Sequence, residues 1–212
     1  MPDRAVQVDD GTRQVPDRKA WWVAVAISAL TVGQLGVATF VPGLPQFEGK
    51  AFGARLLFYP LMMAVVPAGC WLWRRRRGGN EPLPWSACAF VMAPFLVDVT
   101  GNTLDLYDNF WWWDDVNHFG NWLLLCSGLG LLIAAGYVGP RWLLILTITG
   151  LGAALAIAWE LGEWYTFIRH GTELDTAYQD TLGDETLGTL GALAAGVFVA
   201  RTRQWGHAGG SA

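Results

Sequence analysis

The chain alternates between long apolar stretches and short polar segments, and this alternation repeats six times. A helix needs about 20 apolar residues to cross the ~30 Å hydrocarbon core of a bilayer, because each residue adds ~1.5 Å. The pattern therefore predicts an all-α fold, a polytopic membrane helix bundle with about six transmembrane helices. The predicted spans are Trp21–Val41, Leu56–Trp73, Trp85–Thr103, Val116–Val138, Trp142–Phe167 and Leu182–Ala200.

Polar residues flank this predicted membrane domain at both ends of the chain. Residues 1–20 are polar, mixed in charge and contain two prolines, a composition typical of a disordered leader. Residues 204–212 form a short tail rich in glycine. We therefore expect a cytoplasmic leader at 1–20, one six-helix membrane domain at 21–203 and a cytoplasmic tail at 204–212.

The basic residues divide unequally between the two sides of the predicted bundle. With six spans, one side receives eleven of the fourteen Lys and Arg residues and the other side three. Cytoplasmic loops are the ones enriched in Lys and Arg, so both termini are predicted to be cytoplasmic. The eleven are Arg4, Arg13, Arg18, Lys19, Arg74, Arg75, Arg76, Arg77, Arg141, Arg201 and Arg203, and the three are Lys50, Arg55 and Arg169.

Composition changes this picture little. The chain is 53% hydrophobic and only 15% charged, and its basic residues lie at the ends of spans, so nucleic-acid binding is not expected. Cys70, Cys88 and Cys126 all fall in apolar stretches and are interpreted as buried thiols. The expected partner is the lipid bilayer.

Acidic residues occur inside three of the predicted spans, close to their outer ends. Glu160 and Glu163 share one helix face, and Asp180 and Asp184 are one turn apart. Asp114 and Asp115 precede His118 by four and three residues, so either acid can face it. The third span carries Asp98, with Asn102 one turn above it.

An acid at mid-helix costs about 2.5–3.5 kcal/mol in the membrane, so something must offset this cluster. Protonation, hydrogen bonds or a bound cation could each do so. The only bases that the sequence places nearby are His118, His170 and Arg169. One hypothesis is a site for a divalent cation, either a hard ion or zinc with His118 as a ligand, beside the alternatives of protonation and hydrogen bonding. Its candidate ligands are Asp115, His118, Glu160, Glu163, Asp180 and Asp184, and the candidate catalytic residues are Glu160, Glu163 and His118.

Small residues recur every four positions on the sixth span, at Gly188, Ala192 and Gly196. Such a face permits close contact between helices. Packing within the chain is the first interpretation, and a homodimer through these three residues is the second.

Short motifs in the second half of the chain resemble those of a known family. They are Asp115-x-x-His118-Phe119, Trp159-Glu160-x-x-Glu163, Asp180-Thr181-x-x-Asp184 and Gly191-Ala192. This order is similar to that of the YjdF-like small bacterial inner-membrane proteins, which resemble the VanZ-like group. The resemblance implies a multi-pass protein of the bacterial inner membrane. The YjdF-like proteins have no established activity, so the resemblance to them implies none. The VanZ-like group is associated with glycopeptide resistance.

Four functions stay open on this evidence. The first is an inner-membrane protein whose outer acidic and histidine site binds a cation. The second is a membrane-embedded hydrolase or transferase that acts on a lipid-linked envelope substrate. The third is a proton- or cation-coupled transporter, although the inner halves of the last three spans contain no ionisable group. The fourth is a non-catalytic membrane scaffold.

Overall fold

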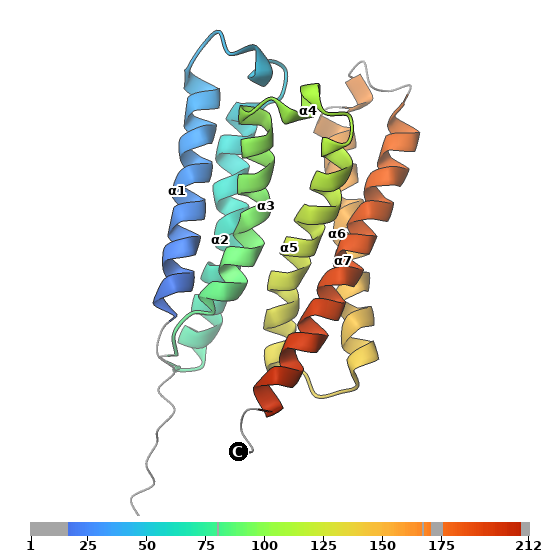
Figure 1. The fold of residues 1–212 in the computed structure, drawn as a ribbon. Coiled ribbons are helices and arrows are strands. Elements are labelled where there is room, and N and C mark those ends of the chain that lie inside the picture. The colour runs from blue at the N-terminus through green and yellow to red at the C-terminus, as the bar shows by residue number, and fades with distance from the viewer. Residues whose placement is uncertain (1–16, 80, 167, 171–175, 209–212) are drawn as a thin grey trace, which may run out of the picture.

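The computed structural model describes residues 17–79, 81–166, 168–170 and 176–208, and every regular element in these ranges is helical. The six long helices, α1, α2, α3, α5, α6 and α7, run alternately up and down beside one another (Figure 1). Their order confirms the predicted all-α bundle. The elements are α1 Arg18–Phe40, η1 Pro45–Phe47, α2 Phe52–Arg76, α3 Trp85–Thr103, α4 Leu106–Asn109, α5 Trp113–Gly136, α6 Arg141–Thr166, η2 Ile168–His170 and α7 Ala177–Ala208.

Five of the long helices are apolar and long enough to cross a membrane: α1, α2, α5, α6 and α7. Helix α3 is not among these five, and it carries Pro94, Asp98 and Asn102. It is nevertheless packed between α1 and α5, and nine of its nineteen residues are buried. The third predicted span is thus an interior helix of the bundle.

The ends of the chain differ slightly from the predicted boundaries. Helix α1 already begins at Arg18, where Asp17 accepts a hydrogen bond from the backbone N–H of Ala20 at 3.1 Å. Helix α7 continues to Ala208, well into the predicted tail. The rest of the leader, residues 1–16, and of the tail, residues 209–212, lie outside the described residues.

The bundle consists of two groups of three helices. One core lies between α1, α2 and α3 and contains Leu35, Tyr59, Cys88 and Val99. The other lies between α5, α6 and α7, and Trp159 packs against both cores. Contact between α3 and α5 joins the two groups.

Apolar side chains also cover much of the outside of the bundle. On α2, Leu57, Leu61 and Val65 are 61%, 58% and 65% exposed and recur every four residues. A helical stripe of this kind would be unfavourable in water but suits contact with lipid. The bundle therefore presents a lipid-facing surface.

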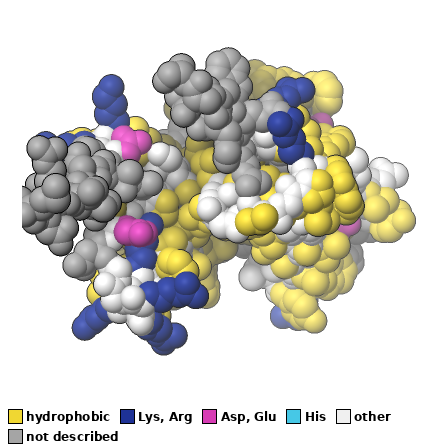
Figure 2. All heavy atoms as spheres, turned by 90° about the horizontal axis from the view of Figure 1, so that it is seen from below, with side chains coloured by type: hydrophobic (Ala, Val, Ile, Leu, Met, Phe, Trp, Pro, Cys, Tyr) yellow, Lys and Arg dark blue, Asp and Glu magenta, His cyan; other side chains and the backbone are white. Residues whose placement is uncertain are grey.

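The two ends of the bundle differ in charge. The lower end, as drawn in Figure 1, holds the start of α1, the arginines that end α2, and the start of α6. Figure 2 shows Lys and Arg side chains at this end among apolar ones. The upper end holds the acidic side chains of α5, α6 and α7. Most of the described Lys and Arg residues thus lie at the lower end, as the loop pattern predicts.

Candidate functional site

Three helix ends meet at the top of the second helix group. The first turns of α5 carry Asp114 and His118, the last turns of α6 carry Glu160 and Glu163, and the second turn of α7 carries Asp184. Because α5 and α7 run down while α6 runs up, these positions fall at the same level. The acids of the fifth and sixth predicted spans therefore face one another, as expected.

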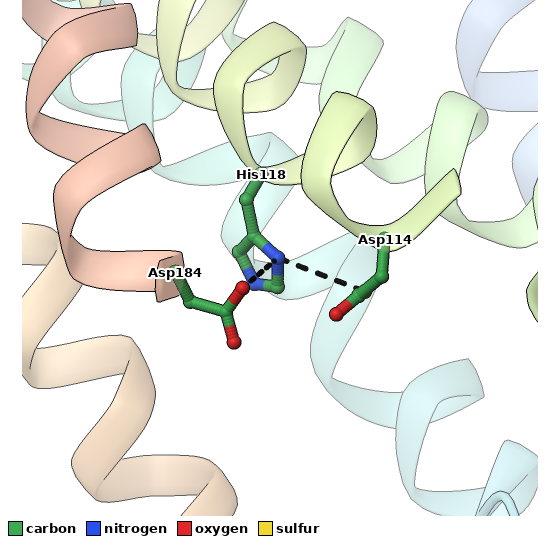
Figure 3. A group of neighbouring side chains, drawn as sticks. All are labelled: Asp114, His118 and Asp184. Carbon is green, nitrogen blue, oxygen red and sulfur yellow. Dashed lines mark ion pairs between the residues drawn. The ribbon is translucent and has the colours of Figure 1, made fainter. Parts of the chain in front are cut away.

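His118 lies at the centre of this group and contacts three carboxylates. Its Nδ1 atom is 2.8 Å from Oδ1 of Asp184 and 3.6 Å from Oδ1 of Asp114 (Figure 3). Its Nε2 atom is 3.8 Å from Oε1 of Glu160. The contact with Asp184 is the shortest of the three and lies within hydrogen-bonding distance of Nδ1. Each ring nitrogen thus faces at least one acid.

Glu163 completes the group from the next turn of α6. One ligand atom each from His118, Glu160 and Glu163 lies within 4.8 Å of the others, and the same holds for Asp114, His118 and Asp184. Thr181, on α7, lies beside Glu160. We call His118, Glu160, Glu163, Asp184 and Asp114 the His118 site.

The His118 site is buried and rich in negative charge. The side chains of Glu160 and Asp184 are each only 6% exposed, and that of His118 is 11% exposed. Among the described residues, no Lys or Arg forms an ion pair with any of the site's four carboxylates. Burying charges without partners is costly, so the site calls for added positive charge, as metal ions or protons.

The structure brings together most of the predicted ligands, but not all. His118, Glu160, Glu163 and Asp184 belong to the site. Asp115, a predicted ligand, is exposed and belongs to neither group of potential ligands. Asp114, which was not among the predicted ligands, lies beside His118 instead. Asp180 is exposed at the start of α7 and belongs to neither group of potential ligands.

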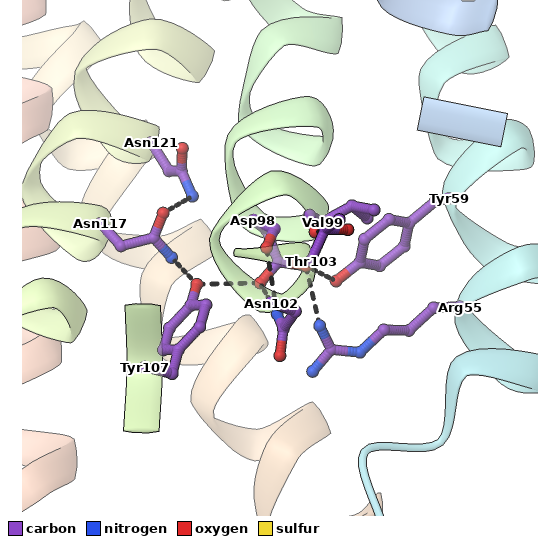
Figure 4. Close-up of polar contacts among 9 residues, drawn as sticks. All are labelled: Arg55, Tyr59, Asp98, Val99, Asn102, Thr103, Tyr107, Asn117 and Asn121. Atoms are coloured by element: carbon purple, nitrogen blue, oxygen red, sulfur yellow. Dashed lines mark hydrogen bonds and ion pairs between the residues drawn. The ribbon is translucent and has the colours of Figure 1, made fainter. Parts of the chain in front are cut away.

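A second polar group surrounds Asp98. The main partner of Asp98 was not predicted from the sequence. Arg55 donates a hydrogen bond to Oδ2 of Asp98 at 2.8 Å, and Tyr59 donates to the same oxygen at 2.7 Å (Figure 4). Asn102 and Tyr107 contact Oδ1 at 3.4 Å and 3.0 Å. The expectation that only His118, His170 and Arg169 lie near the acids was therefore wrong, because Arg55 enters the interior from the first turn of α2.

The Asp98 group continues toward the His118 site. Asn117 donates a hydrogen bond to the hydroxyl of Tyr107, and Asn121 donates to Asn117 at 2.9 Å (Figure 4). Burial and the carboxylate of Asp98 raise the pKa of Tyr107 well above its usual value, so this hydroxyl stays protonated. Tyr107 thus links Asp98 of α3 to Asn117 of α5, the residue that precedes His118.

Comparison with protein families assigns the chain to a group of membrane proteins. The model of the family described as "Predicted membrane protein (DUF2238)" matches residues 50–205. The chain belongs to this family. The match spans α2 to α7, and therefore both the Asp98 group and the His118 site of this DUF2238 protein. Searches of curated proteins and of solved structures found no match.

The small residues of α7 pack inside this DUF2238 chain. A side chain added at Gly188 would meet Trp122 and Ala156, and one at Gly196 would meet the backbone of Ile145. Ala192 is 0% exposed and lies against Gly152 of α6. The contact within the chain is confirmed, and these three residues offer no free face for a homodimer.

Proposed function

We propose that this DUF2238 chain is a multi-pass protein of the bacterial cytoplasmic (inner) membrane, with both termini in the cytoplasm. The family match and the five apolar helices support a membrane location. The resemblance to YjdF-like proteins supports a bacterial inner membrane. The basic lower end supports a cytoplasmic position for the termini, and the His118 site would then lie near the outer face.

We further propose that the His118 site binds one divalent cation. The observation that carries this proposal is a buried histidine surrounded by four carboxylates, none of which is paired with Lys or Arg in the described part of the chain. The Asp98 group is the contrast, because its single carboxylate already has a guanidinium and two hydroxyl donors. A cation supplies the charge that the His118 site lacks.

The arrangement favours the Nε2 side of the ring as the cation position. There the available ligands are His118, Glu160 and Glu163, whose atoms lie within 4.8 Å of one another. Neighbouring ligand atoms of a tetrahedral zinc ion are about 3.4 Å apart, so these side chains would have to draw closer together around the ion. Asp114 lies on the other side of the ring and is 42% exposed. Water already solvates its carboxylate, so a bound cation would stabilise it less.

Asp184 has a different role in this proposal. It lies beside Nδ1, on the side of the imidazole opposite the cation. Carboxylates in that position hold a ligating histidine in orientation and make it a better ligand. A nitrogen and carboxylate oxygens together suit zinc or another first-row divalent ion better than calcium, which binds oxygen ligands.

Thermal unfolding of the purified protein with added cations tests this proposal. Zn²⁺ or Mn²⁺ should raise the melting temperature of the parent protein, because a ligand that binds only the folded state stabilises it by about 2.7 kcal/mol at a hundredfold excess over its Kd. Glu160→Gln should abolish most of the shift. Asp115→Asn is the matched control, since it removes an exposed acid of α5 that lies outside the site.

Three results would speak against cation binding. They are the absence of a shift with any divalent ion, equal shifts in the parent and Glu160→Gln proteins, and equal losses in Glu160→Gln and Asp115→Asn. In the first case the carboxylates are balanced by protons, and Glu160→Gln should then stabilise the metal-free protein.

A further inference from the structure

A cavity of about 350 Å³ lies at the lower end of the bundle, away from the His118 site. It lies between the first turns of α1 and α3 and is lined by Arg18, Trp21, Trp22 and Trp85. Its walls therefore combine one guanidinium with three large aromatic rings. Tryptophan rings of this kind are enriched where the lipid headgroups meet the hydrocarbon.

The guanidinium of Arg18 is available to a ligand. The adjacent acid, Asp17, accepts hydrogen bonds from the backbone of Ala20 at 3.1 Å and from the hydroxyl of Ser86 at 3.2 Å. Among the described residues, no carboxylate forms an ion pair with Arg18. Lys19 is exposed beside it and adds a second positive charge.

A second hollow at the same end has a different character. It measures about 290 Å³ and contains Arg74 and Arg75. Arg74 donates hydrogen bonds to the backbone carbonyls of Glu81 and Pro82, and Arg75 lies 5.2 Å above the ring of Trp71. These two arginines are engaged within the chain, so the cavity at Arg18 is the better candidate for binding.

We propose that Arg18, Trp21, Trp22 and Trp85 form a binding site for the headgroup of an anionic phospholipid. Guanidinium groups bind phosphate oxygens through paired hydrogen bonds. Basic segments beside a transmembrane helix are attracted to anionic lipids of the cytoplasmic leaflet. The cavity opens next to Trp22 and Val25, which are 62% and 38% exposed on one face of α1, and this apolar face accommodates the acyl chains.

Lipid binding measured by native mass spectrometry tests this site. Parent protein in detergent is titrated with phosphatidylglycerol and, separately, with phosphatidylcholine. We expect the anionic lipid to be retained preferentially, and Arg18→Gln to weaken its binding about fivefold, the equivalent of ~1 kcal/mol per basic residue at an anionic surface. Arg201→Gln, an exposed arginine at the lower end of α7, is the matched control and should bind as the parent does.

The Arg18→Gln variant should remain folded, because a positive charge at a helix N-terminus opposes the helix dipole and its removal costs no stability. An unchanged melting temperature without lipid verifies this. Equal retention of the two lipids by the parent overturns the proposal. Equal weakening of phosphatidylglycerol binding by Arg18→Gln and Arg201→Gln also overturns it, because the lipid would then respond to the overall surface charge and not to one site. Displacement of the lipid by millimolar inorganic phosphate also overturns it, since the site would then bind free phosphate.

Discussion

At the scale of single residues, the two buried polar groups differ in how their carboxylates are balanced. Asp98 receives hydrogen bonds from Arg55, Tyr59 and Tyr107, so its charge is neutralised within the chain. Glu160 and Asp184 are more deeply buried and have His118 as their only basic partner among the described residues. The Asp98 group is therefore expected to stabilise the fold, and the His118 site to bind a ligand.

The ion pair of Arg55 with Asp98 gives a residue-scale prediction about stability. Arg55→Gln leaves a carboxylate that is only 17% exposed without its cation, and should lower the free energy of unfolding by about 3 kcal/mol. Arg55→Gln combined with Asp98→Asn should recover part of this loss, because no unpaired charge remains. Denaturant unfolding in detergent measures both. A double variant as unstable as the sum of the two single variants would contradict a neutralising role.

The residues of the site could be predicted only in part. Helical spacing put Glu160 and Glu163 on one face, and the alternating direction of the spans put them at the level of His118 and Asp184, with which they lie in the structure. Spacing could not choose between Asp114 and Asp115, because both lie within one turn of His118 and the rotation of α5 depends on its packing. Arg55 was missed because its partner lies 43 residues away, in a contact that only the tertiary fold creates.

At the scale of helices, the site depends on how closely α5 and α7 approach. A Cβ added at Gly191 of α7 would lie 2.3 Å from the carbonyl oxygen of Phe119, the residue next to His118. No side chain fits at that distance, so glycine sets the spacing between the two helices. The same helix approach brings Asp184 within 2.8 Å of His118.

Gly191→Ala should therefore disturb both stability and the site. The added methyl group meets backbone atoms that cannot rotate away, and overpacking of this kind costs about 1–3 kcal/mol. We expect a lower melting temperature and weaker stabilisation by Zn²⁺. Gly150→Ala on α6 is the control, because a Cβ there meets nothing within 4 Å. If both variants behave alike, close contact of α5 and α7 does not determine the site.

The helices themselves were the easiest part to predict. The hydropathy pattern located all six long helices, and five of them are apolar and long enough to cross a bilayer. The arrangement into two groups of three was not predicted, because it depends on contacts such as that of Gly128 in α5 with Val91 and Ala87 in α3. Spacing along one helix carries no information about which neighbour a glycine meets.

At the scale of the whole molecule, the separation of charges predicts an orientation in the membrane. Arg74, Arg75 and Arg76 lie in the last turn of α2 at the lower end, whereas the His118 site lies at the upper end. The lower end should face the cytoplasm, because basic loops are retained on that side. The two proposed binding sites would then lie at opposite faces of the membrane.

Labelling of single cysteines in intact cells tests this orientation. In a Cys70→Ala background, Trp111→Cys should react with an impermeant thiol reagent, because Trp111 is 87% exposed at the upper end. Glu81→Cys, in the lower loop between α2 and α3, should react only after the cells are opened. Labelling of Glu81→Cys but not Trp111→Cys in intact cells would show that the orientation is reversed.

The central claim is that the His118 site holds a cation, and the metal content of the purified protein tests it most directly. The parent protein, isolated without chelators and analysed by inductively coupled plasma mass spectrometry, should contain a stoichiometric amount of one divalent metal. Glu160→Gln should contain little of that metal, and Asp115→Asn should contain as much as the parent. A parent protein that is free of metal and takes up none on dialysis against Zn²⁺ or Mn²⁺, or a Glu160→Gln variant that keeps its full metal content, would contradict the claim.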